Sequence, residues 1–146
     1  MRRSDIAIKA FNEGANCAQS VVLAFAGDFN LDRDTAFALS RGFGSGMAVG
    51  GPCGVLSGAV IVIGLSTGIG VNNNDAKPKA YALVKEFTTW FKSQVGSTLC
   101  RDLIGCDISL PEQARAAREK GTFQEICAPM IREMVEKLEE TIGVSR

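Results

Sequence analysis

The sequence predicts an all-α fold, a compact single-domain bundle of about six to eight helices around a central apolar helix at residues 53–69. Apolar residues recur at intervals of three and four along most of the chain, which is the helical period. Glycines, prolines and short polar segments separate these periodic stretches. One stretch in the middle is apolar on nearly all sides, as is typical of a buried helix. With 146 residues the chain has the length of one domain, so we expect residues 1–146 to form a single helical domain.

Two helices are expected at the N-terminal end. The first covers 5–13 and ends at Gly14, because glycine tolerates the left-handed conformation that follows many helices. The second covers 17–27 and follows Asn16, whose side chain is a good acceptor for the free N–H groups of a first turn. Its residues expected to face inward are Ala18, Val21, Val22 and Phe25.

A short third helix and a glycine-rich connector precede the central helix. The third helix begins at Asp32 or Asp34, and the inward residues expected on it are Ala36, Phe37 and Leu39. The connector, RGFGSGMAVGGP, ends in Pro52, which suits the first position of a helix because its φ is preset and it has no N–H. Residues 55–71 carry no charge, but this stretch is at the lower limit of length for a membrane span. Its serines, threonine and glycines disfavour insertion, so we expect a core helix.

Glycines recur every four residues through the connector and the central helix. Where the backbone is helical, this spacing puts small residues on one face and lets a neighbouring helix approach closely. The glycines concerned are Gly46, Gly50, Gly54 and Gly58, with Gly64 and Gly68 as a second pair.

Two helices are expected after the polar turn VNNNDAKPKA. Pro78 opens the first of them, and Ser97 or Thr98 caps a short second one that ends at Gly105. The first is strongly amphipathic, and its inward residues are Ala80, Leu83, Val84, Phe87, Trp90 and Phe91.

The last two helices follow the same signals. Pro111 opens one that ends at Gly121, and the final helix covers 128–141. The residues of the final helix expected to face inward are Ile131, Met134, Val135 and Leu138.

The composition argues against several classes of function. Lys plus Arg and Asp plus Glu both total 16, so the net charge is zero and no basic surface for nucleic acid is indicated. The chain has no histidine, which excludes imidazole ligands, imidazole bases and Ser–His–Asp triads. The N-terminal segment lacks the apolar region of a signal peptide, so we expect a cytoplasmic protein whose thiols stay reduced.

The chemistry of the chain is expected at its five cysteines: Cys17, Cys53, Cys100, Cys106 and Cys127. All but Cys106 fall in the first turn of an expected helix, where free N–H groups and the helix dipole favour a thiolate and lower its pKa. A free cysteine is also a common core residue, so simple packing is the alternative at each position. Cys106 follows Gly105 and reaches Cys100 only if the chain folds back at that glycine.

The spacing of the cysteines excludes familiar local sites. No C-x-x-C is present, which argues against a thioredoxin-type pair, a zinc-ribbon knuckle and covalently bound haem. Cysteines from different helices can still meet in a bundle, as ligands do in other helical bundles. A shell made of thiolates alone suits zinc or an iron–sulfur cluster.

Three stretches are similar to those of a known family: GANCAQSVVLAFA, GFGSGMAVGGPCGVLSGAVIVIGL and CRDLIGCDIS. On these stretches the chain resembles the redox-active family named C_GCAxxG_C_C, whose CGAxxG motif appears at 53–58 with Val55 in place of alanine. The resemblance implies a redox role and four functional cysteines. Cys17, Cys53 and Cys100 match by position, and the fourth is Cys127 or Cys106; the position at a helix start favours Cys127.

Three functions are compatible with these residues. The first is electron transfer by a cysteine-ligated metal centre, preferably an iron–sulfur cluster and without haem, held by Cys17, Cys53, Cys100 and Cys127, with Cys106 as a substitute fourth ligand. The second is a metal-free thiol–disulfide oxidoreductase that uses Cys53 or Cys100 with Cys106 as the resolving thiol. The third is a non-catalytic helical module whose cysteines pack in the core or hold zinc. A redox partner protein is expected, and a homodimer is left open.

Overall fold

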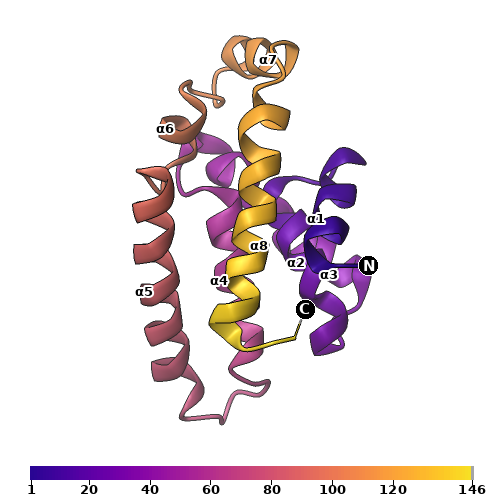
Figure 1. The fold of residues 1–146 in the computed structure, drawn as a ribbon, viewed down its shortest axis with the longest axis vertical. Coiled ribbons are helices and arrows are strands. Elements are labelled where there is room, and N and C mark those ends of the chain that lie inside the picture. Colours follow the sequence, from indigo (N-terminus) through magenta and orange to yellow (C-terminus); the bar gives the residue numbers. More distant parts are fainter. Residues whose placement is uncertain (146) are drawn as a thin grey trace.

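The computed structural model describes residues 1–145, which form eight α-helices and no strand beyond one isolated bridge (Figure 1). The all-helical prediction is confirmed. The helices are α1 (Arg3–Asn12), α2 (Cys17–Ala26), α3 (Arg33–Ser40), α4 (Gly54–Ser66), α5 (Ala76–Val95), α6 (Cys100–Ile104), α7 (Pro111–Glu119) and α8 (Ala128–Ile142). Single turns connect some of them: η1 (Gly27–Phe29), η2 (Arg41–Phe43), η3 (Gly46–Gly50) and η4 (Phe123–Cys127).

The central helix α4 packs against α2, α5 and α8, and α1 packs against α2 and α8. These neighbours cover most of the surface of α4, which accounts for the helix having apolar residues on most of its sides. Its Val55, Val62 and Ile63 are fully buried, as predicted for a core helix. The largest buried side chains around it come from three helices and are Phe25, Phe87, Phe91, Ile131 and Met134. None of the helices in residues 1–145 is both long and apolar enough to cross a membrane.

Helices α2 and α4 touch through two glycines. A Cβ atom added at Gly58 would lie 3.0 Å from the carbonyl oxygen of Ala18, and one added at Gly54 would lie 3.1 Å from the Cβ of Cys17. The predicted small-residue face therefore exists at these two positions. Gly46 and Gly50 lie in the connector with positive φ angles, so their four-residue spacing does not place them on one face of an α-helix.

The predicted start and end of the central helix were wrong. Pro52 does not open the helix, because it is extended and forms an antiparallel bridge with Leu99. Cys53 is the N-cap, and its N–H donates to the carbonyl of Thr98 at 2.7 Å. The helix ends at Ser66 and not near residue 69, since Gly68 takes a φ of +113°.

Other boundaries follow the local signals with small corrections. Asn16 caps α2, and its side chain accepts from the N–H of Gln19 at 2.9 Å, as expected of a capping residue. Helix α5 begins at Ala76, before Pro78. The N-cap of α6 is Leu99 and not Ser97 or Thr98, although the Ser97 hydroxyl accepts the N–H of Leu99 at 3.1 Å.

Helices α1 and α8 are joined by a buried ion pair that the sequence did not predict. Arg3 Nη1 lies 2.7 Å from Glu139 Oε2, and Arg3 Nη2 lies 2.8 Å from Asp28 Oδ1 in the turn η1 that follows α2. Glu139 is only 4% exposed. Charged groups are rarely buried unless they are paired, and Arg3 supplies that pairing.

Candidate functional site

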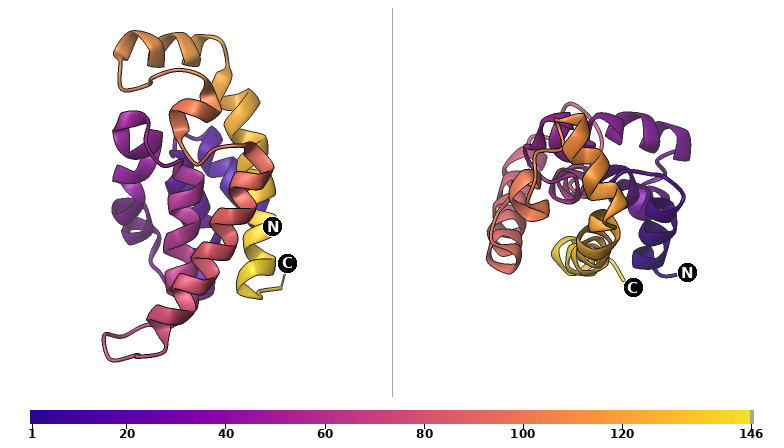
Figure 2. Two further views of the ribbon diagram at one scale, coloured as in Figure 1. Left: turned by 90° about the vertical axis from the view of Figure 1, so that its left-hand side faces the viewer. Right: turned by 90° about the horizontal axis from the view of Figure 1, so that it is seen from above.

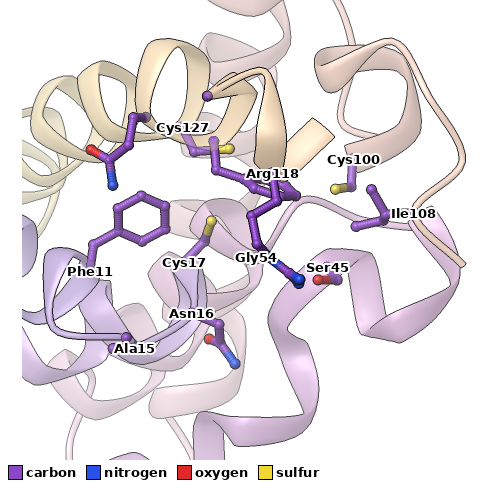
Figure 3. Close-up of a pocket in the computed structure, with 14 residues that line it drawn as sticks. Phe11, Ala15, Asn16, Cys17, Ser45, Gly54, Cys100, Ile108, Arg118 and Cys127 are labelled. Carbon is purple, nitrogen blue, oxygen red and sulfur yellow. The ribbon is translucent and has the colours of Figure 1, made fainter. Parts of the chain in front are cut away.

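Four cysteines from four separate segments meet at one end of the bundle. Cys17 is the first residue of α2, Cys53 caps α4, Cys100 is the first residue of α6, and Cys127 directly precedes α8. Cys17, Cys100 and Cys127 line a pocket of about 400 Å³, and Figure 3 shows the sulfurs of Cys17 and Cys127 on one side of it and Cys100 on the other. Cys53 lies near enough to Cys17 and Cys100 for its charge to raise both of their pKa values. The fold thus gathers the four cysteines that begin helices.

A two-residue bridge holds Cys53 beside Cys100. The Cys53 N–H donates to the carbonyl of Thr98, and the Cys100 N–H donates to the carbonyl of Gly51, each at 2.7 Å. These hydrogen bonds flank the pairing of Pro52 with Leu99. The proline that precedes Cys53 therefore serves the pairing of the two cysteine segments and not the start of the helix.

The glycine-rich connector forms part of the wall of this site. A Cβ atom at Gly46 would lie 2.8 Å from the Cβ of Cys100, and one at Gly44 would lie 2.5 Å from Cγ of Asn16. Ser45, Met47 and Ala48 all take left-handed backbone angles, which is rare outside glycine. The connector is therefore tightly wound beside the cysteines, and its glycines are needed because backbone and side chains approach closely there.

Residues far from the cysteines in sequence complete the pocket. Phe11, Ile108 and Phe123 supply apolar lining, and Arg118 is its charged residue. No motif or spacing in the sequence marks these residues as part of a site. Phe11 and Phe123 have the ordinary appearance of apolar positions on helical segments, and only the tertiary fold brings them to the cysteines.

Cys106 lies outside the pocket lining but close to it. The chain folds back at Gly105, where φ is +75°, and Cys106 packs against the cluster of Cys100, Ile104 and Cys127. It is partly buried, and none of the five cysteines forms a disulfide. The fifth cysteine is therefore a neighbour of the pocket.

The family model described as "Putative redox-active protein (C_GCAxxG_C_C)" matches residues 15–141, which is most of the chain. The protein belongs to this family. The matched residues include all five cysteines, so the resemblance read from the three cysteine-bearing stretches is confirmed. The comparison with curated proteins and the comparison with solved structures gave no match.

The pKa values of Cys53 and Cys100 are high, which contradicts the low values expected for thiols at helix starts. Burial raises the pKa of Cys53 to about 11, although the N–H groups of Val55 and Leu56 act to lower it. Burial also raises the pKa of Cys100 to about 12, with further contributions from Cys53 and Cys127. The helix-start effect is present at Cys53, but loss of hydration outweighs it.

Cys17 and Cys127 form a hydrogen-bonded thiol pair. The bond lowers the pKa of Cys127, because the Cys17 thiol donates to the Cys127 thiolate. It raises the pKa of Cys17, as do burial and the neighbouring cysteines. Cys127 is therefore the member of the pair that ionises first.

The thiols are suitable metal donors, but they do not converge on one point. Among residues 1–145, no three Cys, Asp or Glu side chains are placed to hold a metal ion. A single zinc ion needs every sulfur about 2.3 Å from the same centre. The pocket separates Cys100 from Cys17 and Cys127, so the arrangement does not fit such an ion (Figure 3).

The raised pKa of Cys53 predicts a loss of stability at alkaline pH. Cys53 binds its proton more tightly when folded, with a pKa of about 11, than when unfolded, with a value near 9.0. The stability that the tighter proton binding of folded Cys53 gives is therefore complete below about pH 9 and is lost as the pH rises towards 11. Between about pH 8 and about pH 10.5, metal-free reduced protein should lose about 2 kcal/mol more unfolding free energy than Cys53→Ala, measured by urea denaturation. Equal losses in the two proteins would contradict the assignment.

Proposed function

We propose that the cysteine pocket is an electron-transfer centre in which Cys17, Cys53, Cys100 and Cys127 hold an iron–sulfur cluster. The observation that carries this proposal is that Cys17, Cys100 and Cys127, from three separate segments, line one pocket of about 400 Å³. Cys53 lies outside the lining but near enough to Cys17 and Cys100 for its charge to raise both of their pKa values. A cluster contains several irons and its own sulfide, so its ligands stand on different sides of a cavity and not around a single point. This geometry suits a cluster better than it suits one zinc ion.

The acid–base properties of the buried cysteines support a role as ligands. A thiol with a pKa of 11 or 12 is a poor nucleophile near neutral pH, because the thiolate is the reactive form. A metal removes the proton from a coordinating thiol outright, so a high pKa is no obstacle to ligation. When bound, a cluster would supply one-electron transfer.

The surroundings of the proposed ligands are those that tune a redox centre. The backbone N–H groups of Val55 and Leu56 act to lower the pKa of Cys53, so they would also favour a ligating thiolate there. Phe11, Ile108 and Phe123 would keep water from the sulfurs. We assign Cys127 and not Cys106 as the fourth ligand because Cys127 lines the pocket and is hydrogen-bonded to Cys17.

The test is purification without oxygen followed by iron and sulfide analysis and a visible spectrum. We expect bound iron and sulfide, and a broad visible absorption that bleaches on reduction. Cys53→Ser and Cys127→Ser should lose most of the iron, whereas the matched variant Cys106→Ser should retain it. A colourless protein that iron and sulfide cannot reconstitute would reject the proposal.

A second candidate, thiol–disulfide exchange, is favoured by the hydrogen bond between Cys17 and Cys127. The Cys127 thiolate would attack a substrate disulfide and release one substrate thiolate, which takes up a proton. The Cys17 thiol would then lose its proton and displace the second substrate thiol, leaving a Cys17–Cys127 disulfide and a substrate reduced by two electrons. The pair expected from the sequence, Cys53 or Cys100 with Cys106, has less support because the pKa values of Cys53 and Cys100 are high.

This second candidate has its own test in metal-free protein. Mild oxidation by oxidised glutathione should remove two hydrogens per chain and, by peptide mapping, link Cys17 to Cys127. Reduction should restore both thiols. A disulfide between other cysteines, or none, would reject this pair.

A further inference from the structure

The segment at residues 106–121, which contains α7, is held only loosely by the rest of the protein. It lies across one end of the bundle, between α6 and the turn that precedes α8 (Figure 2). Helix α7 packs extensively against no other helix of residues 1–145. Ala117 is the one buried residue of the segment, and an alanine side chain has little apolar surface to remove from water. Few apolar contacts therefore keep the segment in its place.

The polar contacts of this segment are almost all internal. The Asp107 N–H donates to Gln113 Oε1 at 2.7 Å, which ties the start of the segment to α7. Among the described residues, one hydrogen bond joins the segment to its surroundings, from the Glu125 N–H to the carbonyl of Gly121 at 3.0 Å. The segment forms no ion pair with any other described residue. It can therefore move as a unit without breaking polar contacts to the bundle.

A glycine lies at each end of the segment. Gly105 and Gly121 have φ angles of +75° and +74°, a region that glycine occupies without steric cost. A Cβ atom added at either glycine would meet nothing within 4 Å. Both positions can therefore absorb large changes in φ and ψ, as the hinges of a moving segment must.

In the observed position the segment closes one side of the cysteine pocket. Ile108 and Arg118 belong to the lining of the pocket (Figure 3). Ile108 is half-buried and packs against the apolar cluster that contains Cys100 and Cys127. Movement of the segment away from the bundle would open the pocket on this side.

We propose that residues 106–121 form a lid that turns about Gly105 and Gly121 and controls access to the cysteine pocket. The closed lid shields the pocket thiols from solutes. The open lid admits small reactants, such as the iron and sulfide that a cluster requires or a substrate disulfide. This inference concerns access to the pocket, so it does not depend on which of the two candidate functions is correct.

The first test is hydrogen exchange of the full-length, reduced and metal-free protein at low concentrations of urea. The amides of α7 should exchange at least about tenfold faster than those of α4 and α8, because the lid opens without unfolding of the bundle. Their exchange rates should not change with urea, since local opening exposes little new surface. Exchange of α7 at the rate of α4, with the same dependence on urea, would overturn the lid.

The second test links opening to the pocket through Ala117, the buried contact of the lid. Ala117→Asn places a polar amide at this position and should favour the open lid. The matched control is Ala116→Asn, which makes the same uncharged substitution at the exposed neighbouring residue. N-ethylmaleimide should alkylate Cys127 about tenfold faster in Ala117→Asn than in the wild type, measured by peptide mapping. The rate in Ala116→Asn should stay within about twofold of the wild-type rate.

Two results of the second test would overturn the lid. The first is an equal alkylation rate in the two variants. The second is a lower urea midpoint of Ala117→Asn together with faster exchange throughout α4 and α8, because α7 would then belong to the bundle core. Both tests use metal-free protein and are therefore independent of the iron analysis. If the protein binds no iron but Ala117→Asn opens the pocket, the cluster is rejected and the lid stands.

Discussion

Replacing Gly58 with valine is expected to lower the free energy of unfolding by about 3 kcal/mol, because the helices α2 and α4 touch at this glycine. An added Cβ would lie 3.0 Å from the carbonyl oxygen of Ala18 and 3.1 Å from the Cβ of Val21. Both neighbours are fully buried and belong to a helix that is itself packed on other sides, so neither can give way cheaply.

The matched control for this substitution is Gly64→Val in the same helix. An added Cβ at Gly64 meets nothing within 4 Å, and the residue is exposed. Valine is a better helix former than glycine, so Gly64→Val should change the free energy of unfolding by no more than about 0.5 kcal/mol. Urea denaturation followed by circular dichroism measures both variants. If Gly58→Val were as stable as Gly64→Val, the folded protein would not have the close contact between α2 and α4 at Gly58.

This contact also gives a physical meaning to the sequence motif CGAxxG. Its second glycine is Gly58, and its first glycine, Gly54, lies against Cys17. Both glycines let α4 approach α2 closely, which brings Cys53 at the start of one helix near Cys17 at the start of the other. The motif therefore sets the spacing between two cysteines as well as supplying one of them.

Much of the fold could be predicted because its signals are local. Asn16 and Gly105 mark helix ends through their own side chain or backbone freedom, and the apolar period of the last helix predicts 128–141 against an observed Ala128–Ile142. The prediction that Pro52 opens the central helix was wrong, because Pro52 pairs with Leu99, a residue far away in the sequence. No local pattern distinguishes a proline that opens a helix from one that pairs with a distant strand-like segment.

The candidate site was predicted in part for the same reason. The position of cysteines at helix starts is visible in the sequence, and these four cysteines meet in the structure. Their pKa values were not predictable, since burial depends on what the other helices cover and here outweighs the N–H groups at Cys53. No local pattern indicated that Phe11 and Arg118 line the pocket, because only the fold brings them to the cysteines.

Replacing Arg3 with leucine is expected to cost about 3 to 5 kcal/mol of unfolding free energy, because it leaves Glu139 buried without its cation. Arg3 Nη1 lies 2.7 Å from Glu139 Oε2, and Glu139 is 4% exposed. Arg3 also pairs with Asp28, whose pKa it lowers, and its guanidinium group lies 5.4 Å from the ring centre of Phe25. Loss of these contacts weakens the packing of α1 against α2 and α8.

The matched control is Arg132→Leu, which breaks a second ion pair between the same helices α1 and α8. Arg132 Nη1 lies 3.0 Å from Asp5 Oδ1, but the two side chains are 44% and 46% exposed, so we expect a loss below about 1 kcal/mol. The double variant Arg3→Leu with Glu139→Leu should recover much of the stability, because a buried pair can often be replaced by apolar residues. Urea denaturation at neutral pH compares the variants. If Arg3→Leu cost no more than Arg132→Leu, Glu139 would have to be hydrated in solution, and the buried ion pair would not hold α1 against α8.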